Sequence, residues 1–381
     1  MKYMGSKRLM LQNGLGNLIR RRSASAERVI DLFSGAGYVS WFVATKTNRS
    51  VLAVDLQSYA RDMAAAVIER TEPISDELLI PWINLSRREA ELSPLFAEAN
   101  RIEDAISAAH TPIEQVVDQA RILCATSAGG QIWRAYGGHY FSPLQALLFD
   151  YLLLHLPQVE PFKTVCLAAV IEAASRCVAS PGHTAQPFQP TATAAPHLLD
   201  AWRRDPVNYA VTSFHRIAPY HAQVQGRALV GNANDIAETL LPTDLVIVDP
   251  PYSGVQYSRF YHVLEAISRG TCGEVSGVGR YPSLAERPQS AYSNGGQSTH
   301  AITQLLERLA DRGTSVILTF PAHECSNGLS GEDVIEIANR FFRVRKKVIA
   351  GRFSSLGGTN GVANRSARFD AQELALTLSP R

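Results

Sequence analysis

The four residues Asp249-Pro250-Pro251-Tyr252 place a carboxylate, two rigid prolines and an aromatic ring directly after the apolar run 245–248. The run predicts a buried strand, and the prolines end it because neither can donate a ladder hydrogen bond. The Asp249 carboxylate and the Pro250 carbonyl are hydrogen-bond acceptors, and Tyr252 offers a ring for stacking. This set suits a planar ring with an exocyclic amino group. The alternative is an Asx-type turn at a strand end, with Tyr252 packed as an ordinary half-buried ring.

A glycine turn upstream favours the chemical interpretation. Residues 29–34 predict a short strand that leads into Gly35-Ala36-Gly37 and then into a helix over 38–44. Glycines at such a turn let the backbone approach a ligand closely, because no Cβ stands in the way. The dinucleotide-binding fingerprint Gly-x-Gly-x-x-Gly is incomplete, however, since its last position is Ser40. The glycine turn alone is therefore weak support for nucleotide binding.

Two further predicted strands end in polar residues. The strand 51–54 ends in Asp55, about 20 residues after the glycines, where dinucleotide-binding folds carry a ribose-binding acid. Asp55 is alternatively a helix cap, a role that Ser58 fills equally well. The third strand, 228–230, precedes Asn234 and Asp235, which either contact the ring of a nucleoside or cap a short helix. The combination of strand ends favours nucleoside binding.

In this order, the motifs resemble those of S-adenosylmethionine-dependent amino methyltransferases. The segment 2–7 resembles the aromatic-x-Gly-x-Lys segment that opens Dam-like DNA adenine methyltransferases, and 138–146, 168–175 and 256–265 also resemble that class. The resemblance covers most of the chain, up to about residue 365. It implies an α/β fold, with a Rossmann-like S-adenosylmethionine-dependent methyltransferase sheet and a largely helical target-recognition insertion. It also implies S-adenosylmethionine as cofactor, S-adenosylhomocysteine as product, and no metal.

The resemblance implies a role for each motif residue. The implied catalytic residues are Asp249, Pro250, Pro251 and Tyr252. The implied cofactor-binding residues are Tyr3, Lys7, Asp31, Phe33, Ser34, Gly35, Gly37, Asp55, Leu56, Asn234, Asp235 and Asp249. Of these, Lys7 is expected to hold the cofactor's carboxylate and Asp55 its ribose hydroxyls. The implied reaction is methyl transfer to N6 of an adenine flipped out of double-stranded DNA, in a restriction-modification or defence context that could include a cognate restriction or defence protein.

Several alternatives stay open. A cytosine N4-methyltransferase would use the same geometry, although Ser is commoner there in place of Asp249, and an RNA adenine methyltransferase fits the motif equally. Protein glutamine methylation would favour Asn at that position. A catalytically silent nucleic-acid-binding subunit would keep the fold, but the intact motifs speak against decay. A nicotinamide oxidoreductase is disfavoured by the incomplete glycine fingerprint and the Pro-Pro turn.

The chain of 381 residues predicts two parts. Residues 1–70 and 226–381 are expected to form the cofactor-binding and catalytic domain, with additional strands at 315–320, 342–349 and 373–378. Residues 71–225 are expected to form the target-recognition or DNA-binding insertion, although the best-known members carry theirs nearer the catalytic strand. The Gly/Ser/Tyr-rich segment 270–299 is expected to be a lid or a DNA-contacting loop.

Composition limits the class of protein. An apolar content of 46% and a charged content of 19% are typical of a globular enzyme, and a net charge of +2 predicts no general polyanion binding. Five scattered cysteines without Cys-x-x-Cys spacing indicate reduced thiols in a cytoplasmic protein. We expect no membrane association, because no apolar run is long enough to span a bilayer. Basic clusters at 20–22, 87–88, 203–204 and 343–347 are interpreted as solvated faces, with no assigned contact.

Overall fold

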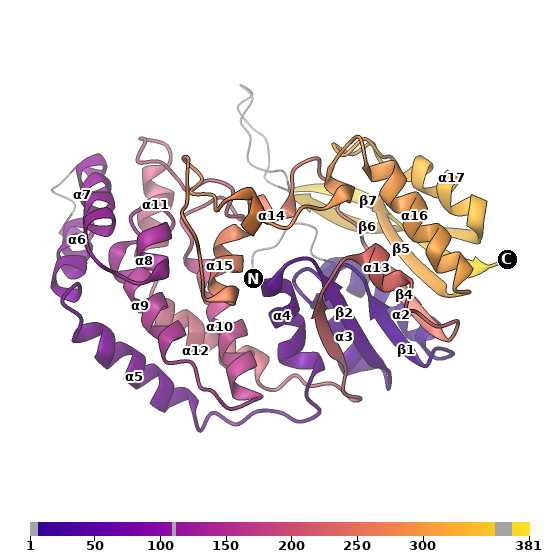
Figure 1. The fold of residues 1–381 in the computed structure, drawn as a ribbon, viewed down its shortest axis with the longest axis horizontal. Helices are drawn as coiled ribbons and strands as arrows, with labels where there is room; N and C mark the ends of the chain where they lie inside the picture. Colours follow the sequence, from indigo (N-terminus) through magenta and orange to yellow (C-terminus); the bar gives the residue numbers. More distant parts are fainter. Residues whose placement is uncertain (1–6, 109–111, 355–367) are drawn as a thin grey trace. The chain divides into compact units, whose positions relative to one another are not determined.

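The computed structural model describes residues 7–108, 112–354 and 368–381, which form two compact units (Figure 1). The first unit contains residues 74–219 and 259–287 and is called the helical unit. The second contains the described residues up to 73, together with 220–258 and the described residues from 288 onward, and is called the sheet unit.

One seven-stranded mixed sheet forms the centre of the sheet unit. Its strands are β1 Arg28–Asp31, β2 Ser50–Asp55, β3 Arg227–Val230, β4 Asp244–Val248, β5 Ser315–Pro321, β6 Phe342–Ser354 and β7 Arg368–Pro380. The order is β3-β2-β1-β4-β5-β7-β6, in which the first five strands are parallel and the last two run antiparallel to their neighbours. Each strand overlaps a segment that the sequence predicts as a strand. The chain is therefore α/β, and the sheet is compatible with a Rossmann-like fold.

Helices cover both faces of this sheet, which explains why the central strands β4 and β5 are continuous apolar runs. On one face, α16 Ser298–Asp311 and α17 Gly331–Phe341 bury their apolar stripes in a common core with β1, β4 and β5 (Figure 1). Helices α3 Tyr38–Lys46 and α4 Ser58–Ile68 contact β1, β2 and β3. The shorter elements are α1 Arg8–Met10, the π-helix η1 Leu11–Leu15, α2 Gly16–Ser23, α13 Ala233–Ala237, α14 Tyr257–Phe260, and the 3₁₀ turns η2 Leu284–Glu286 and η3 Ala291–Ser293.

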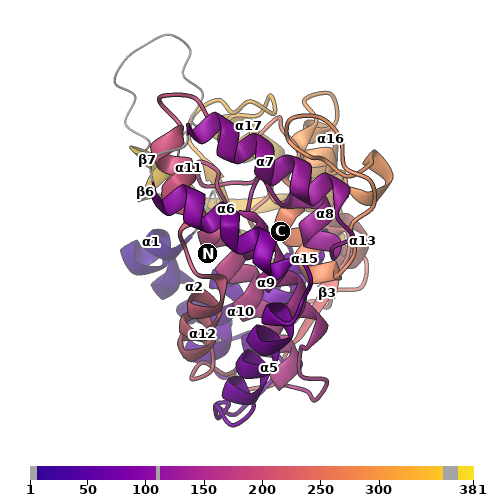
Figure 2. The same cartoon turned by 90° about the vertical axis from the view of Figure 1, so that its left-hand side faces the viewer.

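The helical unit packs around two apolar helices. Its helices are α5 Leu79–Glu91, α6 Phe96–Ala108, α7 Ile113–Thr126, α8 Gln131–Tyr136, α9 Pro143–Leu154, α10 Phe162–Cys177, α11 Ala195–Trp202, α12 Pro206–Ile217 and α15 His262–Arg269. Helix α9 contacts α5, α6 and α8 (Figure 2), and α10 contacts α12 and α15. No helix in the described ranges has the length and apolar character needed to cross a bilayer.

The observed units differ from the predicted division at one long segment and at both ends of the predicted insertion, since 71–73 and 220–225 belong to the sheet unit. Residues 259–287, which were expected in the catalytic domain, belong to the helical unit. The His262 ring lies 5.6 Å from the rings of both Tyr136 and Tyr140, measured between centroids. Arg280 donates hydrogen bonds to the carbonyls of Arg134 and Ala135, both at 2.9 Å. These contacts attach the segment to α8, and no local sequence pattern predicts them.

Candidate active site

A cavity of about 430 Å³ lies in the sheet unit, beyond the carboxyl ends of β1, β2 and β4. The strand order reverses between β1 and β4, and doubly wound sheets bind ligands at this switch point. The volume falls in the range of small-molecule sites, roughly 300–1,000 Å³. The predicted site residues that line the cavity are Lys7, Asp31, Phe33, Ser34, Gly35, Asp55, Leu56, Asn234, Asp235, Asp249, Pro250, Pro251 and Tyr252. Tyr3, the other aromatic residue assigned to the cofactor, lies outside the described residues.

The glycine turn is tied to the end of β2. The backbone N–H of Gly35 donates to Asp55 Oδ2 at 2.8 Å, and that of Gln57 donates to Oδ1 at 3.0 Å. Gly37 precedes α3 with a φ of +77°, a conformation that favours glycine, and a Cβ there would lie 3.0 Å from Trp41 Nε1. Gly37 therefore shapes the turn. A carboxylate has about four acceptor positions, so the tether leaves Asp55 chemically able to accept ligand hydroxyls as well.

Asp31 is a buried carboxylate among the residues that line the cavity. Its side chain is 2% exposed and accepts a hydrogen bond from Ser40 Oγ at 2.6 Å. Its pKa is raised to about 7, mainly by burial and also by the negative charges of Asp249 and Asp55, against the lowering effect of the Ser40 hydrogen bond. Among the described residues Asp31 makes no ion pair. A cation in the cavity would therefore stabilise its ionised form.

Asp249 is held by one oxygen and keeps the other available. Its Oδ1 accepts from Thr319 Oγ1 at 2.7 Å and lies 2.9 Å from Lys7 Nζ. Within the described residues neither Asp249 Oδ2 nor the Pro250 carbonyl oxygen has a hydrogen-bond donor. The Asp249 side chain is 20% exposed and, with Pro250, borders the cavity. The two acceptors predicted from the sequence thus belong to residues that line the cavity, and neither is used by a donor among the described residues.

Lys7 lines the cavity and is also paired with two carboxylates of the protein. Its Nζ is buried between two carboxylates, 2.9 Å from Asp249 Oδ1 and 2.9 Å from Glu373 Oε2. Burial alone would lower the pKa of Lys7, but the two carboxylates reverse that effect and raise it. Burial also raises the pKa of Asp249, an effect that Lys7 opposes and Glu373 reinforces. The ammonium group therefore orients Asp249, and its contacts to a cofactor carboxylate stay a prediction.

The Asp-Pro-Pro-Tyr turn is fixed by its neighbours. Asn327 Nδ2 donates to the carbonyl of Pro251 at 3.2 Å and to that of Tyr292 at 3.0 Å. The Tyr252 ring packs edge-to-face on Phe320, with centroids 6.4 Å apart. Tyr252 is half-buried and lines the cavity, as stacking on a ligand requires. The turn is accordingly rigid before any ligand arrives.

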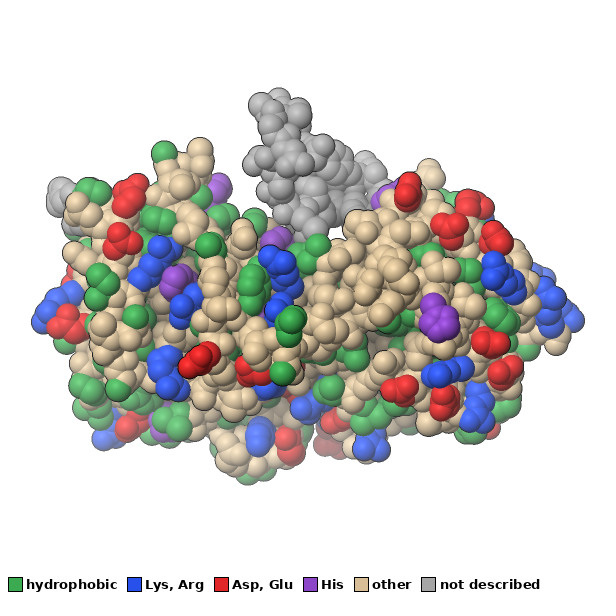
Figure 3. Space-filling view, turned by 45° about the horizontal axis from the view of Figure 1, so that its top comes forward, with side chains coloured by type: hydrophobic (Ala, Val, Ile, Leu, Met, Phe, Trp, Pro, Cys, Tyr) green, Lys and Arg blue, Asp and Glu red, His purple; other side chains and the backbone are tan. Residues whose placement is uncertain are grey.

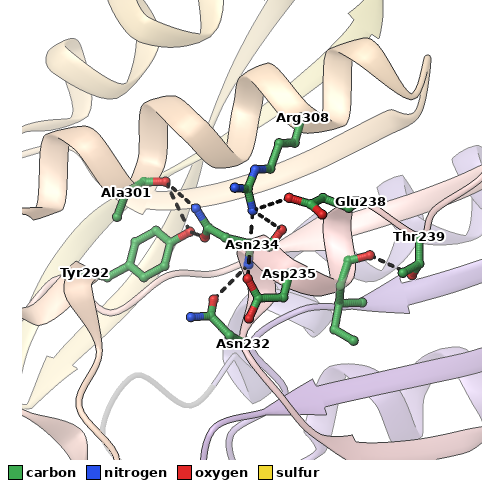
Figure 4. A network of polar contacts seen from close by, with 9 residues as sticks. Asn232, Asn234, Asp235, Glu238, Thr239, Tyr292, Ala301 and Arg308 are labelled. Atoms are coloured by element: carbon green, nitrogen blue, oxygen red, sulfur yellow. Dashed lines mark hydrogen bonds and ion pairs between the residues drawn. The ribbon is translucent and has the colours of Figure 1, made fainter.

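The structure separates the roles of Asn234 and Asp235 (Figure 4). The N-cap of the short helix α13 is Asn232, so neither Asn234 nor Asp235 caps it. The Asn234 side chain donates to the Ala301 carbonyl at 3.1 Å and accepts from the Tyr292 hydroxyl at 2.5 Å. Its amide therefore forms hydrogen bonds within the protein, while Asn234 also lines the cavity, so its contact with a ligand stays a prediction.

Asp235 is the more accessible of the two residues. Its side chain is 79% exposed at the rim of the cavity, 4.0 Å from Arg308 Nη1. Arg308, on α16, also donates to the Asn234 carbonyl at 2.7 Å and lies 3.0 Å from Glu238 (Figure 4). This arginine holds α13 in place and leaves the Asp235 carboxylate facing the cavity rim. Asp235 therefore lines the cavity with an exposed carboxylate, and its contact with a ligand stays a prediction.

Sequence reasoning missed the residues that orient Asp249. Thr319 is a hydroxyl within the apolar run of β5, and Glu373 is an acid on β7. A polar residue inside a buried run is a usable signal for Thr319, because a buried hydroxyl requires a partner. Glu373 gave no such signal, since β7 reaches its position beside β5 only through the strand order. Residues 288–292, from the predicted lid segment, also line the cavity.

No known family model and no curated protein matches this chain. In the part of the chain that the structure describes, no cluster of three or more His, Cys, Asp or Glu side chains is arranged to hold a metal ion. The function is therefore inferred from the site itself.

Proposed function

We propose that the protein is an S-adenosylmethionine-dependent DNA methyltransferase that acts on the exocyclic N6 amino group of a flipped-out adenine. The observation that carries the proposal is the pair of open acceptors, Asp249 Oδ2 and the Pro250 carbonyl, on a rigid turn beside a cavity. An exocyclic amino group has two N–H donors, so one can bind to each acceptor. The proposal assigns target recognition to the helical unit and includes double-stranded DNA, with a cognate restriction or defence protein, as partners.

The cavity residues fit the proposed cofactor. Asp31 is a buried carboxylate without a counter-charge among the described residues, which suits a ligand that carries positive charge. Asp55 stands at the end of β2, where a carboxylate can accept from ribose hydroxyls. Phe33 lines the same wall, packed edge-to-face on Tyr292 with centroids 5.1 Å apart. When bound, S-adenosylmethionine supplies a methyl group on a positively charged sulfur.

The chain's own residues would prepare the amino group for attack. The lone pair of an aromatic amine is delocalised into its ring, so the amine is a poor nucleophile. Hydrogen bonds to Asp249 and Pro250 would localise that lone pair and fix its direction, so that catalysis comes from positioning and electrostatics. The raised pKa of Asp249 suits a group that accepts hydrogen bonds from an amine about to lose a proton.

Tyr252 would hold the target base by stacking. A base inside a duplex cannot reach a cavity at a sheet edge, so it has to be flipped out at a cost of a few kcal/mol. Stacking of a base on an aromatic ring contributes about 1–3 kcal/mol, which offsets part of that cost. Because Asn327 and Phe320 hold the turn in place, little further ordering of Tyr252 is required.

The test is to incubate the purified protein with methyl-labelled S-adenosylmethionine and unmethylated genomic DNA, and then to identify the labelled nucleoside. The proposal predicts N6-methyl-2′-deoxyadenosine in the DNA digest. Label in N4-methyl-2′-deoxycytidine would overturn the base assignment and keep the amino methyltransferase class. Cofactor binding without any label in DNA, with label in RNA or protein instead, would overturn DNA as the substrate.

A further inference from the structure

Two basic clusters that are far apart in the sequence meet on one face of the sheet unit. The Arg22 guanidinium, on α2, donates to Ser379 Oγ on β7 at 3.1 Å. Ser379 is the cross-strand partner of Arg343 on β6. The N-terminal cluster and the cluster 343–347 are therefore neighbours in the fold, although some 320 residues separate them in sequence.

Because successive side chains of a strand point to opposite faces of the sheet, the cations of β6 lie on two faces. Arg343, Arg345 and Lys347 follow each other at every second residue, so they share a face, about 6.6 Å apart along the strand. Lys347 reaches η1 on that face, since a Cβ on Gly14 would lie 3.0 Å from its Nζ. Lys346 points the other way, toward α17, where it lies 3.0 Å from Glu332. We call Arg22, Arg343, Arg345 and Lys347 the basic face.

The cations of the basic face have no acidic partners among the described residues. Arg343, Arg345 and Lys347 are exposed, and none of the four residues makes an ion pair with a described acid. The nearest acid on the same face of β7, Glu373, is already paired with Lys7. By contrast, acidic and basic side chains lie interspersed on the face of this unit drawn in Figure 3. Nearby Arg340 is likewise paired, with Glu336.

Uncompensated arginines in a row point to a polyanion. Edge strands often carry charges that prevent edge-to-edge pairing, and scattered lysines suffice for that purpose. Here three of the four cations are arginines, whose planar forks bind phosphate oxygens in a bidentate manner. We propose that the basic face contacts the phosphate backbone of double-stranded DNA. The choice of DNA as the polyanion rests on the proposed function, whereas the charge arrangement does not.

The test compares two double variants that remove equal charge from the same region. R343Q/R345Q alters the basic face, whereas R340Q/K346Q alters two ion-paired cations, one on α17 and one that contacts α17. Binding to a DNA duplex is measured over a range of salt concentrations, with S-adenosylmethionine binding as the check on folding. Neutralising two phosphate contacts should lower the slope of log K against log salt by about 1.8 and weaken binding at low salt by tenfold or more, roughly. The R340Q/K346Q variant should retain the slope of the parent protein.

Equal losses of DNA affinity in both variants, or an unchanged salt slope in R343Q/R345Q, would contradict the proposal that the basic face contacts DNA. A loss seen with single-stranded RNA but not with duplex DNA would overturn DNA as its occupant. The outcome is separable from that of the methylation assay because it requires no methyl transfer. If the parent protein methylates DNA and R343Q/R345Q keeps the parent's salt slope, the proposed function holds and the proposed DNA contact of the basic face is wrong. If R343Q/R345Q changes the slope but the parent protein methylates no substrate, the DNA contact holds and the proposed function is wrong.

Discussion

Buried carboxylates occur in both units, and they are satisfied in different ways. In the helical unit, Asp150 accepts the backbone N–H groups of Ile132 at 2.8 Å and Trp133 at 2.9 Å, so both of its oxygens are used. Glu172 is bonded to Arg216 and Arg176. In the sheet unit, Asp31 has no cation among the described residues and Asp249 keeps one oxygen open to a cavity. Burial therefore does not mark a functional acid, but unused acceptor capacity beside a cavity does.

The pKa values follow the same contrast. Burial raises the pKa of Asp31 to about 7, with little to oppose it but hydrogen bonds. Burial also acts on Glu172, but positive charge that includes Arg216 outweighs it and lowers the pKa. Glu172 belongs to an ion pair within the protein, whereas a positively charged ligand could pair with the carboxylate of Asp31.

The comparison is tested most strongly by the pair D249N and D150N. Replacing Asp249 should lower methyl transfer by about 10²–10³-fold, because one acceptor is replaced by an amide that can also repel the substrate N–H. Cofactor affinity should stay close to that of the parent protein. Single-turnover transfer and equilibrium binding would be measured on the same preparation.

D150N is the matched control in the helical unit. It should destabilise folding by about 1–3 kcal/mol, because an amide N–H₂ then faces the backbone donors of α8. Turnover per folded molecule should not change. If D249N retained full transfer, or D150N lost turnover without losing stability, the distinction between the two units would fail.

The sequence predicted the strands and the acids at their ends better than it predicted their partners. Apolar runs closed by Gly, Pro or Asp are local signals, so Asp31, Asp55 and Asp249 could be placed at one sheet edge. The Lys7–Asp249–Glu373 cluster could not, because it depends on β7 lying between β5 and β6. The position of residues 259–287 in the helical unit likewise depends on contacts between segments that are distant in sequence, so it could not be predicted from local patterns.

A second test addresses the structural acid of the helical unit. E172Q should lower the free energy of unfolding by about 1–3 kcal/mol, since it leaves Arg216 without its carboxylate. The arginine side chains are about one-third exposed, so solvent limits the cost. Urea denaturation measures the change. An unaltered unfolding midpoint would show that the ion pair contributes nothing, and an effect on cofactor affinity would contradict its purely structural role.

Asp31 offers a smaller effect that sharpens the contrast through pH. Its pKa in the folded protein is about 7 against an ordinary 3.8, so the folded state binds the proton more tightly, and the stability contribution of Asp31 falls as pH rises from about 4 to about 7. The D31N variant should not show this decrease in stability with pH, so above pH 7 it should be more stable relative to the parent protein than at low pH. Thermal unfolding temperatures of both proteins across this pH range measure the difference.

Binding of a cation should shift the same equilibrium. S-adenosylmethionine should release a proton near pH 7 as Asp31 ionises, and its affinity should rise by up to about tenfold between pH 6 and pH 8. Calorimetry in two buffers of different ionisation enthalpy measures the released proton. D31N should bind more weakly and lose both the proton release and the pH dependence. Proton release that persists in D31N would assign the effect to another group.

The smallest expected effect concerns Glu373, which acts on Asp249 through Lys7. Glu373 adds negative charge beside Asp249 and so raises its pKa, while Lys7 opposes the increase. E373Q would leave a one-to-one pair of Lys7 and Asp249, so the acidic limb of the pH–rate profile should move to lower pH with only a modest change in maximal rate. K7M should move that limb to higher pH, because Asp249 then keeps only the like charge, and the double variant K7M/E373Q should lie between them. Equal rate losses at every pH in all three variants would mean that the cluster supports only the fold, and would leave Asp249 without an electrostatic control from β7.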